Sequence, residues 1–147
     1  MKALIEILAA GGGTLFFSMF YNIHGKKLLT AGIGGMLTWA ICLLVTELSG
    51  SQYIAFLASA VVANTLAEAL ARMFKTPTTT FVVPLLIPLI PGGGLFYTMS
   101  AAVGQDWTTF ASKGQETVFL FCMLAVGIMV VSSVKKIMQG IASLKIR

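Results

Sequence analysis

Charged side chains are scarce in this sequence, and acidic ones most of all. Of its 147 residues, 10% are charged and only five are Asp or Glu, whereas 57% are hydrophobic. The mean hydropathy is +0.92. A soluble domain carries roughly a quarter of charged residues, and the charges present here are too few to cover such a surface. The composition therefore predicts an integral membrane protein.

Histidine and cysteine are also nearly absent, which excludes several kinds of site. The single histidine, His24, rules out a bis-histidine haem and a histidine metal cluster. Cys42 and Cys122 lie far apart in apolar runs, so we expect two buried small side chains and neither a disulfide framework nor a zinc site. No set of nucleophile, base and orienting group is recognisable. We therefore expect no metal, no cofactor and no enzyme.

Five apolar segments are long enough to cross a bilayer, which takes about 20 residues. They cover approximately residues 3–23, 28–48, 53–74, 81–103 and 117–138. The connectors between them leave no room for a separate soluble domain. We therefore predict an all-α, polytopic membrane protein in which residues 1–147 form a single transmembrane domain. The first segment has no convincing cleavage site, and we interpret it as a retained helix.

The ten basic residues are distributed unevenly around these five segments. Lys2 and Lys113 would lie on one side of the membrane. Eight would lie on the other side: Lys26, Lys27, Arg72, Lys75, Lys135, Lys136, Lys145 and Arg147. The positive-inside rule then predicts an N-terminus outside and a C-terminus in the cytoplasm. The basic residues form no stripe with interleaved aromatic residues, so the net charge of +5 does not indicate a nucleic-acid partner.

The fourth segment contains helix-breaking residues in the stretch PLLIPLIPGGGLFY, residues 84–97. Proline cannot donate to the carbonyl four residues earlier. Pro88 would therefore leave the carbonyl of Pro84 without its helical donor. Pro91 would do the same to the carbonyl of Ile87. The glycines that follow admit backbone angles closed to other residues. We predict that the helix unwinds over residues 91–94 and restarts from about Leu95.

A break of this kind is a candidate substrate site near the membrane midplane. Irregular backbone inside a bilayer persists only when it is buried in protein or lines a wet cavity. The start of a second half-helix offers N–H groups and a positive dipole end to a carboxylate. The predicted substrate-binding residues are Pro88, Pro91, Gly92, Gly93, Gly94 and Tyr97. The alternative is a kink that only lets a neighbouring helix pack closely.

Glu68 is the acidic residue that lies deepest within a predicted spanning segment. Asn64, Glu68 and Arg72 share one helical face. Glu68 and Arg72 are four residues apart, in the favourable order for an ion pair. Charges within a membrane are costly and mark functional sites by default. We therefore interpret Asn64, Glu68 and Arg72 as a proton or substrate relay that faces the broken helix. The alternative is a structural ion pair near the cytoplasmic end.

The sequence from Thr76 to Met99, TPTTTFVVPLLIPLIPGGGLFYTM, resembles the signature of the threonine/serine exporter (ThrE) family. In its C-terminal membrane half, a proline-rich stretch followed by glycines precedes an aromatic residue. The preceding NTLAEALARMFKTP, residues 64–77, is similar to the approach to that signature. The length and the five-segment pattern extend the resemblance over essentially the whole chain.

This resemblance implies a subunit of an exporter. Some family members are one long chain, and others are split into two proteins, of which this chain resembles the smaller. It implies a larger membrane subunit as partner, in a bacterial inner membrane, and leaves a homo-oligomer open. The fused form exports threonine and serine, whereas the split pair resembles exporters of small dicarboxylates such as succinate. A scaffold subunit without a transport role is the alternative.

Overall fold

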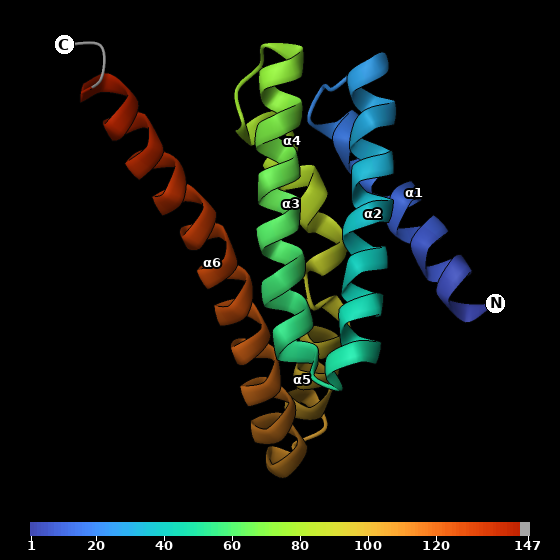
Figure 1. The fold of residues 1–147 in the computed structure, drawn as a ribbon. Coiled ribbons are helices and arrows are strands. Elements are labelled where there is room, and N and C mark those ends of the chain that lie inside the picture. The colour runs from blue at the N-terminus through green and yellow to red at the C-terminus, as the bar shows by residue number, and fades with distance from the viewer. Residues whose placement is uncertain (145–147) are drawn as a thin grey trace.

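The computed structural model of the chain describes residues 1–144, with side chains up to residue 137 (Figure 1). In chain order the elements are α1 (Lys2–Phe20), α2 (Lys26–Ser49), α3 (Gln52–Phe74), α4 (Thr79–Leu86), the 3-10 helix η1 (Ile87–Leu89), α5 (Gly92–Val103) and α6 (Trp107–Leu144). All these elements are helical, so the prediction of an all-α protein is confirmed.

The helices of the described residues include enough apolar spans for a polytopic membrane protein. The segments Lys2–Phe20, Lys26–Ser49, Gln52–Phe74 and Trp107–Ile137 are each long and apolar enough to cross a bilayer. A further candidate is the pair Thr79–Leu89 and Gly92–Val103, whose two halves are bent by 56°. The predicted break in the fourth segment is therefore confirmed.

The largest difference from the predicted boundaries is in α6. The sequence predicted a loop up to residue 116, but the helix begins at Trp107 and extends beyond the predicted end at 138. The backbone N–H of Thr109 donates to the Asp106 carboxylate over 3.1 Å and caps the first turn. Hydrogen bonds from the side chain and backbone of Thr109 lower the pKa of Asp106. Hydropathy alone does not distinguish this polar helical turn from a loop.

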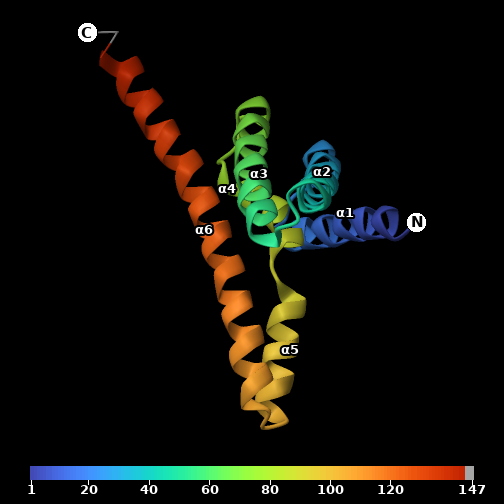
Figure 2. The ribbon, with the colours of Figure 1, turned by 60° about the horizontal axis from the view of Figure 1, so that its bottom comes forward.

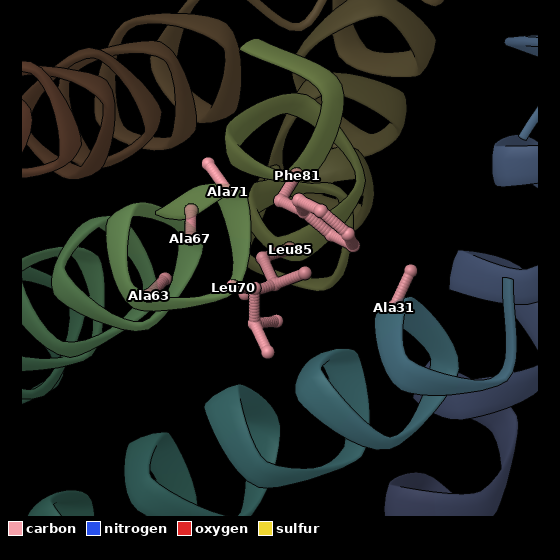
Figure 3. Packing of buried hydrophobic residues seen from close by; sticks show 7 residues of the cluster. All are labelled: Ala31, Ala63, Ala67, Leu70, Ala71, Phe81 and Leu85. Atoms are coloured by element: carbon pink, nitrogen blue, oxygen red, sulfur yellow. The ribbon is translucent and has the colours of Figure 1, made fainter. Parts of the chain in front are cut away.

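Small residues on α3 allow α4 to pack closely. Ala63, Ala67 and Ala71 recur every four residues and are buried in one cluster with Phe81 and Leu85 of α4 (Figure 3). This cluster holds the first half of the broken segment against the bundle. The second half, α5, has a different neighbour.

α5 pairs with the first half of α6 and extends away from α1, α2 and α3 (Figure 2). The pairing is tight because Gly94 lies directly against Thr117 and Gly114 lies near Thr98. The first half of α6 also packs on α3, where Leu120 and Leu124 join Phe56 in one cluster. Farther along α6, Gly127 approaches Ala60 of α3, and the C-terminal half of α6 then diverges from α3. The first half of the broken segment therefore packs against α2 and α3, whereas the second half packs against α6.

Candidate functional site

The break in the fourth segment lies at Ile90 and Pro91. Proline disfavours helical angles in the residue before it, and Ile90 has extended angles of φ −66° and ψ 121°. Pro91 then stands at the N-cap position of α5, which starts at Gly92. The second half-helix therefore restarts three residues before the predicted position at Leu95.

The carbonyls expected to lack donors are occupied, because the chain tightens into η1 before the break. The Ile87 N–H donates to the Pro84 carbonyl. The Ile90 N–H donates to the Ile87 carbonyl over 3.2 Å. At the break, the backbone groups without a hydrogen-bond partner include N–H groups. In the described chain, the N–H groups of Gly93 and Gly94 donate to no carbonyl.

A pocket of about 340 Å³ opens at this break, and we call it the break pocket. Its lining consists of Trp39, Gln52, Phe56, Pro88, Ile90, Pro91, Gly92, Gly93, Gly94, Tyr97, Lys113, Glu116, Thr117 and Leu120. All six predicted substrate-binding residues are therefore in one pocket. Gln52 and Phe56 belong to the first two turns of α3, so the pocket lies toward the α2–α3 connection. A location near the membrane midplane stays a prediction.

The break pocket contains donors as well as a charge pair. Lys113 Nζ lies 2.9 Å from Glu116 Oε2 on the same face of α6. The indole N–H of Trp39 is buried and has no hydrogen-bond partner within residues 1–144. An unpaired buried donor costs free energy. Trp39 and the two glycines all line the break pocket.

The three glycines of the break have different roles. A β-carbon on Gly92 or Gly93 would meet no atom within 4 Å, so both positions have open space beside them, and both glycines line the break pocket. A β-carbon on Gly94 would overlap the Thr117 hydroxyl. Gly93 therefore leaves space for a ligand, whereas Gly94 permits the close approach of α5 and α6.

Glu68 and its neighbours lie in a second pocket, of about 390 Å³, which we call the Glu68 pocket. Its lining consists of Asn64, Glu68, Thr78, Thr79, Val82, Ile128, Ser132, Lys135 and Lys136. It lies beside the start of α4, whereas the break follows the end of η1. Glu68 therefore faces the first half of the broken helix, through Thr79 and Val82 of α4, and not the break itself. A relay role for Asn64, Glu68 and Arg72 stays a prediction.

Glu68 is paired with two cations. Its carboxylate lies 3.1 Å from Lys135 Nζ on α6 and 3.6 Å from Arg72 on its own helix. The Asn64 amide donates over 3.2 Å to the Ile128 carbonyl of α6. The predicted pair of Glu68 and Arg72 is thus present, and a third partner from α6 joins it.

A family model described as threonine/serine exporter, ThrE, matches residues 6–134. The chain belongs to the threonine/serine exporter family. A search of curated proteins and a search of solved structures each found no significant match. Membership makes this chain a multi-pass membrane protein of a transporter family and not an enzyme.

Sequence reasoning missed several polar residues that line the two pockets of this threonine/serine exporter family member, among them Trp39, Lys113, Glu116 and Lys135. Trp39, Lys113 and Glu116 reach the break pocket from α2 and α6, and Lys135 reaches Glu68 from α6. The first three are distant from the glycines in sequence, so no local motif links them. The spacing of Lys113 and Glu116 was the one available signal, since residues three apart are neighbours on a helix.

The two cysteines of this exporter family member differ in their surroundings. Cys42 is buried, as expected, in a cluster with Phe56 and Leu89. Cys122 is exposed on α6, so the expectation of burial within the chain is wrong for it. Its side chain points away from the helices that α6 contacts, toward lipid or a partner subunit.

Proposed function

We propose that this chain is the membrane subunit of a small-solute exporter that holds the carboxylate of its substrate in the break pocket. The single observation that carries the proposal is a pocket at an interrupted helix with three unpaired donors, the amides of Gly93 and Gly94 and the indole of Trp39. The positive end of the α5 dipole adds to their attraction for an anion. Tyr97 supplies a further hydroxyl at the rim.

The Lys113–Glu116 pair supports an amino acid as substrate in preference to a dicarboxylate. Threonine and serine carry an ammonium beside their carboxylate, and Glu116 can accept hydrogen bonds from that ammonium. A dicarboxylate such as succinate would bring a second negative charge toward Glu116 and be repelled. The proposed substrates are therefore threonine and serine, with succinate as the competing candidate.

A larger membrane subunit is proposed as partner. α5 exposes large apolar side chains along its length, among them Phe96, Met99 and Val103, which are 68%, 62% and 87% exposed. α5 packs against α6, and α1, α2 and α3 extend away from α5 (Figure 2). A partner helix packed there would enclose the break pocket from the side that this chain leaves open.

We propose a bacterial inner membrane as the location, with the N-terminus outside and the C-terminus in the cytoplasm. Lys135 of α6 contacts Thr78 and Glu68 beside the α3–α4 connection. The α1–α2 and α3–α4 connections lie at the same end of the bundle (Figure 1), so the basic residues near them favour this orientation. Cysteines introduced at His24 and Gln105, with Cys42 and Cys122 replaced by serine, test it. A membrane-impermeant maleimide should label the cysteine at Gln105 in intact cells and not the one at His24. The opposite pattern reverses the orientation.

Export itself is tested by deleting the chain from its host and measuring intracellular threonine, serine and succinate. Threonine and serine should accumulate, and re-expression with the partner should restore their efflux. Gly93→Leu should abolish restoration while the complex with the partner remains intact, because the leucine fills the break pocket. Gly13→Leu, at an exposed site of α1 with open space around it, is the matched control. If Gly93→Leu loses the complex with the partner and Gly13→Leu keeps it, the result favours a scaffold role.

A further inference from the structure

The Glu68 pocket carries an excess of positive charge. Lys135 and Lys136 line it, and Arg72 is paired with Glu68 at its edge. Glu68 is the only carboxylate of the described chain at this end, since the other acids are Glu6, Glu47, Asp106 and Glu116. One carboxylate thus faces three cations.

The neighbours of this charge cluster are groups that bind anions. Lys135 Nζ lies 3.5 Å from the Thr78 hydroxyl. Thr79 and Ser132 contribute further hydroxyls to the lining. The α4 helix begins at Thr79, so its positive dipole end adds to the attraction. Glu68 is only 14% exposed, and Lys135 only 30%, so the charges are partly withdrawn from solvent.

The two pockets share one chemical plan. Each lies at the start of one half of the broken segment and contains a lysine of α6 paired with a resident glutamate. The pairs are Lys113 with Glu116 and Lys135 with Glu68. Between the pockets, an apolar cavity of about 340 Å³ lies between α6 and the α4–η1 segment, lined by residues such as Leu86, Ile90 and Leu124. The two polar pockets thus lie at opposite ends of the interface between α6 and the α4–η1 segment.

We propose that the Glu68 pocket is a second carboxylate-binding site, in which a solute carboxylate displaces Glu68 from Lys135. Lys135 supplies the charge, and Thr78 and Ser132 supply hydroxyl donors. The choice of ligand rests on the proposed function, since the solute held here is the one that the break pocket holds. The site would load substrate at the end of the bundle predicted to be cytoplasmic.

Binding stoichiometry tests this site without transport. Radiolabelled L-serine is titrated onto the full chain in phosphatidylcholine nanodiscs. We expect two sites in the unaltered chain, one site in Lys135→Gln, and two in Lys26→Gln, which removes a lysine at the same end but outside both pockets. Gly93→Leu should keep the site at Lys135 and lose the other. An unchanged stoichiometry in Lys135→Gln overturns the proposal, whereas an unchanged stoichiometry in Gly93→Leu alone overturns the proposed function.

Glu68→Gln is the second variant. It should strengthen L-serine binding in the Glu68 pocket, whereas Lys135→Gln should abolish it. Two cations, Lys135 and Arg72, already hold Glu68, so it competes with the carboxylate of the ligand and does not accept its ammonium as Glu116 does. Removing the Glu68 carboxylate leaves Lys135 free for the ligand, so the affinity of this site for L-serine should rise about fivefold. A purely structural ion pair predicts no rise, and a fall or no change overturns the proposal.

Anionic lipid is the competing ligand for the same cations. The nanodisc titration is repeated with phosphatidylglycerol, and retained lipid is counted by native mass spectrometry. If Lys135→Gln loses phosphatidylglycerol while L-serine binding is unaffected, the pocket is a headgroup site and the proposal is overturned. Retained L-serine binding in both membranes supports a solute site.

Discussion

Thr117 of α6 lies directly against the backbone of Gly94, at the first turn of α5. A β-carbon at residue 94 would overlap the Thr117 hydroxyl, so a side chain at this position forces Thr117 or the helix to move. The Thr117 hydroxyl donates to the Lys113 carbonyl over 2.7 Å, which fixes its position in the interface.

Gly94→Ala should destabilise the α5–α6 hairpin, because the added methyl overlaps Thr117. Overpacking of this kind costs about 1–3 kcal/mol. Thermal unfolding of the detergent-solubilised chain, followed by fluorescence-detected size exclusion, measures the loss. Gly93→Ala is the matched control, since its methyl enters open space. Equal stability of the two variants would contradict the assignment of different roles to the two glycines.

The double variant Gly94→Ala with Thr117→Ala should recover most of that stability. Removing the hydroxyl leaves the Thr117 β-carbon 3.4 Å from the new methyl, which is a close but tolerable contact. The two changes are in direct contact, so a non-additive result is expected. Additive losses in the double-variant cycle would show that Thr117 is not the source of the clash.

The position of the break could be predicted from the sequence because its causes are local. Pro91 constrains Ile90, and no distant residue is needed to interrupt the helix there. The 3-10 helix η1 was not predicted. Proline lacks an N–H donor, but this fact alone does not say which other N–H will donate to the carbonyl left free. The start of α6 was missed for a similar reason, although Asp106 before Trp107 and Thr108 is the kind of residue that caps a helix.

The composition of the pocket could not be predicted in the same way. Trp39 precedes Gly93 by more than fifty residues, and only the packing of α2 beside the break brings them together. Glu68 could be recognised as costly in a membrane, but its partner Lys135 follows from the crossing of α6 over α3. Burial and charge identify candidates in a sequence, whereas tertiary packing decides which of them meet.

Trp39→Phe should weaken substrate binding while preserving the fold. Phenylalanine keeps an aromatic ring but removes the unpaired indole donor. A hydrogen bond to a charged group contributes about 1.5–3 kcal/mol, so the half-saturating concentration of L-serine should rise about tenfold or more. Trp107→Phe is the control, because Trp107 is 66% exposed at the start of α6. If Trp39→Phe leaves the affinity for L-serine unaltered, the indole N–H of Trp39 does not bind the substrate.

Asp106→Ala should lower stability at neutral pH and have no effect in acid. The hydrogen bonds from Thr109 lower the pKa of Asp106 in the folded chain, so its contribution is present above the unfolded pKa of about 4 and is lost as pH falls through the folded value. Melting temperatures of both chains at pH 7 and at about pH 3 measure this difference. Asp106→Asn keeps a capping group without a titratable proton, so its melting temperature should show no matching change with pH.

Glu116→Gln should change substrate preference from serine toward succinate. The resident carboxylate attracts an ammonium and repels a second carboxylate, so its neutralisation weakens serine binding and relieves the repulsion of succinate. Because Lys113 and Glu116 are 46% and 39% exposed, we expect each affinity to change by about fivefold, with opposite signs. Competition of unlabelled succinate against labelled L-serine measures the ratio. Glu47→Gln, an exposed acid near the end of α2 and outside the pocket, should leave that ratio unchanged. If Glu116→Gln weakens both ligands equally, Glu116 only positions Lys113, and the preference for an amino acid loses its structural basis.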